Sequence, residues 1–195
     1  MVLNFLIIFI SYFLGNISFS YILTRIKLKQ DIREFGSGNA GTTNVLRVLG
    51  KKYAVMVLVG DVLKGITAVV LGLIFSTDYL VVTLCGLAVI LGHNWPAVMH
   101  FKGGKGIATS IGVFMLYDPT IALICISSGI FIIAVSRFVS LGSILGMTML
   151  PFVALFYGRS KEELILSLFV SIITIYKHRS NINRLLKGTE NKLKF

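Results

Sequence analysis

Long apolar runs constrain this chain more than any other feature of its sequence. Residues 2–23, 53–76 and 138–157 are each long enough to cross a bilayer as a helix, which takes about 17 to 25 mostly apolar residues. Hydrophobic residues make up 55% of the chain and charged residues 14%, whereas soluble domains carry about 25% charged residues. Lipid must cover the surplus apolar surface. We therefore predict an all-α, polytopic membrane protein whose 195 residues form one domain.

Three further regions are apolar but harder to count as crossings. Residues 79–92 are short unless they continue into the Gly-His-Asn-Trp-Pro segment, and residues 163–176 follow a charged turn. Residues 106–135 are too long for one crossing, and Tyr117-Asp118-Pro119 at their centre is expected to break the helix. We expect seven crossings, or six if residues 106–117 only dip into the bilayer.

Loop charge orients these helices, because Lys and Arg accumulate in cytoplasmic loops. With the N-terminus outside, seven crossings place sixteen of the 19 Lys and Arg residues, Lys194 among them, in the cytoplasm. Arg159 and Lys161 fall outside, and Lys64 lies within the membrane. The predicted C-terminus is cytoplasmic. The net charge of +11 therefore fits a membrane topology, and we expect no nucleic-acid partner.

The first of three polar segments on the cytoplasmic face is FGSGNAGTTNVLR, residues 35–47. Glycines let backbone amides converge on an anion, hydroxyl groups add donors, and an arginine can pair with phosphate through two hydrogen bonds. The alternative is a flexible connecting loop. The candidate phosphate-binding residues are Ser37, Gly38, Asn39, Gly41, Thr42, Thr43, Asn44 and Arg47.

The second segment is GHNWPAVMHFKGGKGIATS, residues 92–110, with a helix predicted to start near Ile107. Free amides at a helix N-terminus attract phosphate, and a lysine on each side of a glycine pair supplies positive charge. The binding candidates are Lys102, Gly103, Gly104 and Lys105. The alternative to phosphate binding is that the two lysines only reflect the ordinary excess of positive charge in cytoplasmic loops. For His93, a structural polar contact and a functional role are equally open.

The third segment is YKHRSNINRLLKG, residues 176–188, where His178, Arg179 and Asn181 lie within one helical turn. The basic tail beyond Arg184 is interpreted as a contact with anionic lipid headgroups. Within the bilayer, Asp61 and Lys64 are three residues apart, so a helix-face ion pair is expected. That pair is either purely structural or a support for the polar site.

The three segments in this order, with Gly-Asp-x-x-Lys-Gly between the first two, resemble the bacterial acyl-phosphate:glycerol-3-phosphate acyltransferase family. Its motifs GSGNxGxTNxxR, GHxWPxxxxFKGGKGxAT and HRxNIxRLxxGxE are legible at residues 36–47, 92–109 and 178–190. The resemblance covers essentially the whole chain. It implies an enzyme of the bacterial inner membrane that moves a fatty acyl group from acyl phosphate to the 1-hydroxyl of glycerol 3-phosphate, giving lysophosphatidic acid.

This resemblance also implies roles for individual residues. His178 and Asn181 become the candidates for orienting the glycerol hydroxyl and taking its proton, with His93 as the second candidate base. Arg179 joins the substrate-binding residues. Acyl phosphate is an activated mixed anhydride, so direct attack by the substrate hydroxyl needs no enzyme nucleophile. The sequence offers no GxSxG motif and no multi-aspartate Mg²⁺ pattern, so we expect no cofactor and no metal.

A small anion transporter or channel is the competing hypothesis, because broken helices and intramembrane charges also occur in transporters. Clustering of the polar groups at one face and the lack of an inverted repeat favour the enzyme.

Overall fold

The computed structural model describes residues 1–193, and all regular secondary structure within that range is helical. The predicted all-α class is therefore confirmed, while Lys194, counted among the cytoplasmic basic residues, lies outside the described range. The chain divides into two compact units, Met1–Leu116 and a second that begins at Tyr117.

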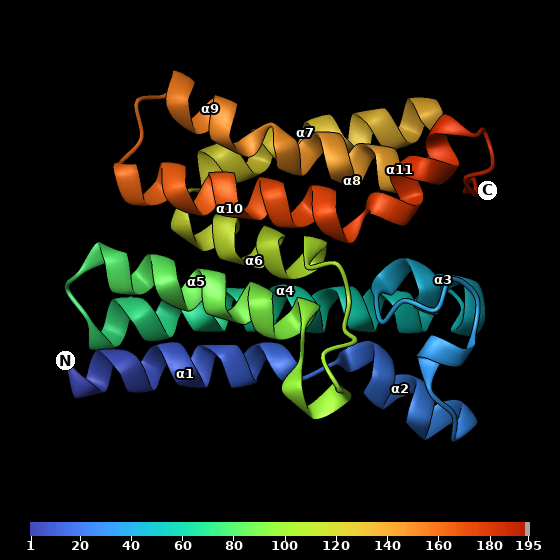
Figure 1. Ribbon diagram of the computed structural model, residues 1–195, viewed down its shortest axis with the longest axis horizontal. Coiled ribbons are helices and arrows are strands. Elements are labelled where there is room, and N and C mark those ends of the chain that lie inside the picture. The colour runs from blue at the N-terminus through green and yellow to red at the C-terminus, as the bar shows by residue number, and fades with distance from the viewer. Residues whose placement is uncertain (194–195) are drawn as a thin grey trace. The chain divides into compact units, whose positions relative to one another are not determined.

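Three long helices of the first unit, α1, α4 and α5, lie side by side (Figure 1). Glycine permits the closest approach: a Cβ added at Gly15 of α1 would lie 2.9 Å from the Cα of Gly92 on α5. Small residues serve this purpose between membrane helices. The elements of this unit are α1 (Val2–Asn16), α2 (Phe19–Leu28), a 3₁₀ turn (Ile32–Glu34), α3 (Thr42–Leu49), α4 (Lys51–Phe75), α5 (Tyr79–Asn94), a second 3₁₀ turn (Ala97–Met99) and α6 (Ile107–Tyr117).

The second unit continues with α7 (Pro119–Ser136), α8 (Val139–Thr148), α9 (Leu150–Phe156), α10 (Lys161–Lys177) and α11 (Arg179–Leu186). The predicted break at Tyr117-Asp118-Pro119 is confirmed, since α6 ends and α7 begins there. Asp118 caps α7 by accepting hydrogen bonds from the amides of Thr120 (2.9 Å) and Ile121 (3.1 Å), and proline fits the first helical turn.

Five helical stretches within residues 1–193 are long and apolar enough to cross a membrane, some of them made of two successive helices: Val2–Leu28, Lys51–Phe75, Tyr79–Met99, Pro119–Ser136 and Val139–Phe156. Two of the predicted spans are not continuous α-helices. The span predicted over residues 2–23 is interrupted at Ile17 and Ser18, and the Ser18 side chain caps the helix that follows. The span predicted over residues 138–157 is divided at Met149, next to a proline in the first turn of α9.

The predicted ion pair in the apolar interior is confirmed. Lys64 Nζ and Asp61 Oδ1 are 2.9 Å apart on α4, and both side chains are almost fully buried. The two cysteines, Cys85 and Cys125, are buried and unpaired.

Candidate functional site

The first polar segment folds around the side chain of Asn44, which is buried in the first turn of α3. Its Oδ1 accepts a hydrogen bond from the Ser37 amide (2.9 Å), and its Nδ2 donates to the carbonyls of Ile32 (3.2 Å) and Phe35 (2.9 Å). Gly36 adopts a positive φ of 57° against this amide, where a side chain would collide. The buried Asn44 side chain therefore holds the backbone of this loop in place through three hydrogen bonds.

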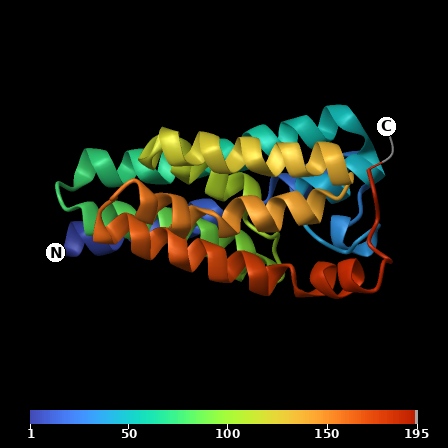
Figure 2. The same cartoon turned by 90° about the horizontal axis from the view of Figure 1, so that it is seen from above.

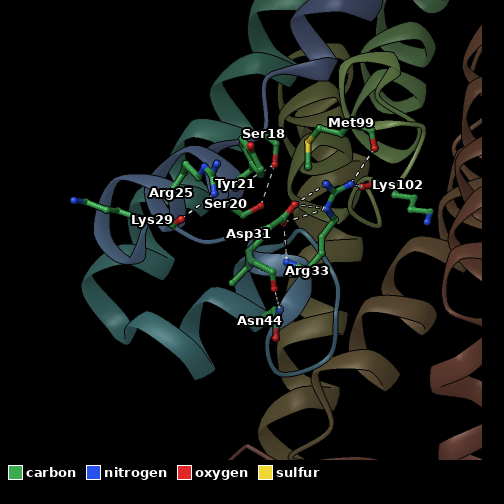
Figure 3. Close-up of polar contacts among 11 residues, drawn as sticks. Ser18, Ser20, Tyr21, Arg25, Lys29, Asp31, Arg33, Asn44, Met99 and Lys102 are labelled. Atoms are coloured by element: carbon green, nitrogen blue, oxygen red, sulfur yellow. Dashed lines mark hydrogen bonds and ion pairs between the residues drawn. The ribbon is translucent and has the colours of Figure 1, made fainter.

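An arginine outside the predicted site residues ties the first polar segment to the second. Arg33 Nη1 donates to the carbonyls of Met99 (2.9 Å) and Lys102 (3.3 Å), and its Nη2 pairs with Asp31 at 2.6 Å, as Figure 3 shows. Partial burial raises the pKa of Asp31, but the hydrogen bonds and charge of Arg33 outweigh it, so this pKa lies below its ordinary value. In the sequence, the Asp-x-Arg spacing was the only signal, and it indicated the pair with Asp31 and not the contacts with the second segment.

The second polar segment wraps around the end of α5. The Gly104 amide donates to the His93 carbonyl (3.1 Å). A Cβ at Gly104 would collide with the His93 ring at Nε2 and would lie 2.7 Å from the Ala40 carbonyl oxygen. The predicted helix start at Ile107 is confirmed. Gly104 thus lies where both polar segments meet, and only a residue without a side chain fits there.

Beneath this loop lies the buried pair of α4. Lys64 Nζ is 2.8 Å from His93 Nδ1, and the same ring nitrogen is 3.5 Å from Asp61 Oδ1. Lys64 therefore joins the α4 ion pair to one of the residues proposed from sequence as catalytic.

The first-unit candidates lie in the two polar loops and in the adjoining turns of α3 and α5, and they differ in exposure. Ser37, Gly38, Arg47 and Lys102 are exposed; Asn39, Gly41, Thr42, Thr43, Gly103 and Lys105 are half-buried; Asn44, His93 and Gly104 are buried. The exposed side chains carry a hydroxyl group and two cations, and glycines stand between them. Such a surface suits an anionic ligand.

His178, Arg179 and Asn181 belong to the second unit, at the break between α10 and α11 that is visible near the red end of the chain in Figure 2. The buried His178 places Nδ1 2.9 Å from the Thr174 carbonyl. A carbonyl only accepts hydrogen bonds, so Nδ1 carries the proton, and in a neutral ring Nε2 holds the lone pair. Arg179 is exposed and stacks over the Tyr176 ring at 4.7 Å.

A glutamate that the sequence reasoning did not single out fixes Asn181. Glu190 accepts hydrogen bonds from Asn181 Nδ2 (2.8 Å), Arg184 Nε (2.7 Å) and the Ser140 hydroxyl (2.9 Å). Burial raises the pKa of Glu190, but these three donors outweigh it and hold that pKa below its ordinary value. Because Nδ2 points to Glu190, the Oδ1 atom is the part of Asn181 suited to accept from a hydroxyl. In the sequence, the signal for this role of Glu190 was its place at the end of the third motif.

Comparison with known proteins gives a consistent result over nearly the whole chain. The family model for glycerol-3-phosphate acyltransferase matches residues 5–188. A glycerol-3-phosphate acyltransferase of Alkaliphilus metalliredigens is 47% identical over 191 residues, covering 98% of this chain and 96% of that protein. One from Thermoanaerobacter pseudethanolicus is 48% identical over 186 residues, covering 94% and 92%.

Solved structures agree in fold. The crystal structure of PlsY, an integral membrane glycerol 3-phosphate acyltransferase, in its glycerol 3-phosphate form is 38% identical, with a TM-score of 0.93 and coverage of 98% of this chain and 96% of that one. Its lysophosphatidic acid form gives a TM-score of 0.89 at the same identity, with coverage of 98% and 95%.

Proposed function

This chain belongs to the glycerol-3-phosphate acyltransferase family, and we propose that it transfers a fatty acyl group from acyl phosphate to the 1-hydroxyl of glycerol 3-phosphate. The products are 1-acylglycerol 3-phosphate, which is lysophosphatidic acid, and inorganic phosphate. Relatives with this name and solved structures of PlsY with glycerol 3-phosphate and lysophosphatidic acid support the acceptor and the product. The activity belongs to phospholipid biosynthesis.

The observation that carries this proposal is the pair of polar loops joined through Arg33 and Gly104. Both proposed substrates carry a phosphate group, and the exposed Ser37, Arg47 and Lys102 offer it one hydroxyl and two cations. Charge-assisted hydrogen bonds from an arginine fork are the strongest of these contacts. We assign phosphate binding to these loops, with the half-buried Lys105 as a further cation.

The reaction is a direct displacement. The 1-hydroxyl oxygen of glycerol 3-phosphate attacks the acyl carbonyl carbon, the new ester C–O bond forms, and the bond from that carbon to the phosphate oxygen breaks. Phosphate leaves with the bonding electrons. The hydroxyl proton passes to Nε2 of His178, while Asn181 Oδ1 orients the hydroxyl by accepting its hydrogen bond. Because acyl phosphate is already activated, no covalent acyl-enzyme is needed.

The purified protein in detergent, supplied with acyl phosphate and glycerol 3-phosphate, is expected to release phosphate and form lysophosphatidic acid in the presence of EDTA. Product analysis by mass spectrometry and a phosphate assay give the two readouts. Activity restored only by Mg²⁺ would contradict the metal-free proposal. Activity with acyl-CoA but not with acyl phosphate would contradict the donor. Turnover in detergent also separates the enzyme from a transporter, which makes no product.

The proposed topology has seven crossings in a single domain of residues 1–195, an outside N-terminus, and the polar loops and C-terminus on the cytoplasmic face of the bacterial inner membrane. The five long apolar helices, the shorter apolar α6 and the 17-residue α10 supply the crossings. Positive-inside charge supports the orientation.

Single-cysteine variants test this topology, in a background where Cys85 and Cys125 are alanine. Lys29→Cys, His100→Cys and Thr189→Cys are expected to resist a membrane-impermeant thiol reagent in intact cells and to react after lysis. Lys161→Cys, the external control, is expected to react in both. Labelling of Thr189→Cys from outside would favour six crossings, and labelling of either loop variant would contradict a cytoplasmic site.

A further inference from the structure

Three ionisable side chains are buried together beneath the loop that carries Gly104. Asp61 and Lys64 lie one helical turn apart on α4, and His93 lies in the last turn of α5. Their side chains are 3%, 2% and 6% exposed, respectively. Charges at such depth in an apolar helical unit are expensive unless they are paired and hydrogen-bonded. The proton arrangement of this cluster is therefore tightly constrained.

Lys64 has more acceptors around its ammonium group than it needs. Its Nζ lies 3.1 Å from the Gly15 carbonyl oxygen, 2.8 Å from the Ile17 carbonyl oxygen and 2.9 Å from Asp61 Oδ1. The two carbonyls are available because α1 ends at Asn16 and the last carbonyls of a helix have no partner within it. Three oxygens thus lie within hydrogen-bonding distance of the ammonium ion, which has three N–H groups to share among its neighbours.

His93 Nδ1 is the fourth atom around Lys64 Nζ, at 2.8 Å. An ammonium nitrogen has no lone pair and cannot accept a hydrogen bond. A proton on Nδ1 would face that ammonium group at 2.8 Å, because the other acceptor near this nitrogen, Asp61 Oδ1, lies farther away at 3.5 Å. Nδ1 therefore holds a lone pair, and the ring proton resides on Nε2. A doubly protonated ring would also add a second buried positive charge against a single carboxylate.

The Nε2 edge of the same ring faces the junction of the two polar loops. A Cβ at Gly104 would collide with Nε2 and would lie 2.7 Å from the Ala40 carbonyl oxygen, while the Gly104 amide donates to the His93 carbonyl. Gly104 stands between the cations Lys102 and Lys105. His93 therefore adjoins the glycine backbone between these lysines in two ways, through its own carbonyl and through the Nε2 edge of its ring.

We propose that Asp61 and Lys64 are positioning residues that hold His93 as its neutral Nε2–H tautomer, so that His93 fixes the Gly103-Gly104 backbone for phosphate binding. This inference rests on the proposed function of the loop. It gives His93 a positioning role in place of the role of general base. The two histidines then have opposite tautomers, since His178 carries its proton on Nδ1.

The tautomer is measured directly by ¹⁵N NMR on protein labelled at histidine, near neutral pH and without substrate. The chain has three histidines, so a His93→Gln sample assigns the His93 signals by their loss. The expected spectrum has a protonated Nε2 and an unprotonated Nδ1. A spectrum with a protonated Nδ1, in a neutral or a doubly protonated ring, would overturn the proposal.

Two matched double variants test the consequence for catalysis. Asp61→Asn with Lys64→Gln keeps an N–H donor near His93 Nδ1, whereas Asp61→Asn with Lys64→Met removes it, and neither leaves an unpaired buried charge. The methionine variant is expected to raise KM for a phosphate substrate about tenfold with kcat within about twofold of native, and the glutamine variant to recover most of that loss. Equal kinetics in the two variants, or a loss confined to kcat, would contradict the positioning role.

The controls separate this inference from the proposed function. Lys52 is exposed on the same helix, so Lys52→Gln is expected to have native kcat and KM. Thermal melting checks that each variant is folded. If the double variants do not fold, the NMR spectrum of the native protein still decides the tautomer. Native protein without acyltransferase turnover would refute the function and leave the tautomer measurement standing.

Discussion

Replacing His178 with alanine is expected to lower kcat by about a hundredfold or more, with a much smaller change in KM, because a positioned general base contributes about 10² to 10⁴ in rate. Nδ1 of the buried His178 bonds to the Thr174 carbonyl, which directs the basic Nε2 to the opposite edge of the ring. Steady-state kinetics with both substrates varied measures the effect.

His100→Asn is the matched control, since His100 is an exposed histidine at a positive φ of 54°, a conformation that asparagine tolerates. It is expected to keep native kcat. If His178→Ala and His93→Ala both retain near-full kcat, no histidine is the base, and a phosphate group of the substrate accepting the proton becomes the better mechanism.

Replacing Arg47 with alanine is expected to raise KM for a phosphate substrate and to lower kcat/KM by about tenfold to over a hundredfold. The guanidinium lies exposed in the last turn of α3, where it can bond phosphate through two parallel hydrogen bonds. Losing a hydrogen bond to a charged group costs about 1.5 to 3 kcal/mol, which sets that range. Ser37→Ala and Lys105→Ala are expected to act in the same direction.

Arg47→Lys keeps the charge but not the fork, so its kcat/KM is expected to fall between native and alanine. Arg25→Ala removes another exposed arginine of the first unit, whose Nη1 bonds the Lys29 carbonyl, and is expected to leave both constants unchanged. An effect of Arg25→Ala as large as that of Arg47→Ala would mean that net charge, and not a local phosphate contact, controls binding.

The sequence by itself determined the features that depend on neighbouring residues. Apolar run length fixed the all-α class, and Asp118-Pro119 fixed the break before α7, because a capping carboxylate and a proline act within one helical turn. The Asp61–Lys64 pair followed from a spacing of three residues on one helix. The motifs identified the family because each lies within one short stretch of the chain and can be recognised without the fold.

Only the tertiary structure decided what those motif residues do within the first unit. Arg33 reaches the Met99 carbonyl across 66 positions of sequence, and Lys64 reaches His93 across 29. No local pattern encodes such pairs. Asn44, grouped by sequence with the phosphate-binding residues, uses its amide to bond the backbone of its own loop.

The same holds for the two buried histidines, which look alike in the sequence. A carbonyl one turn earlier on α10 gives His178 a protonated Nδ1, and an ammonium group from another helix gives His93 an Nδ1 that accepts. The chemistry of an imidazole depends on what lies opposite each nitrogen. That neighbour is set by helix packing, so the sequence named the histidines and the folded structure distinguished them.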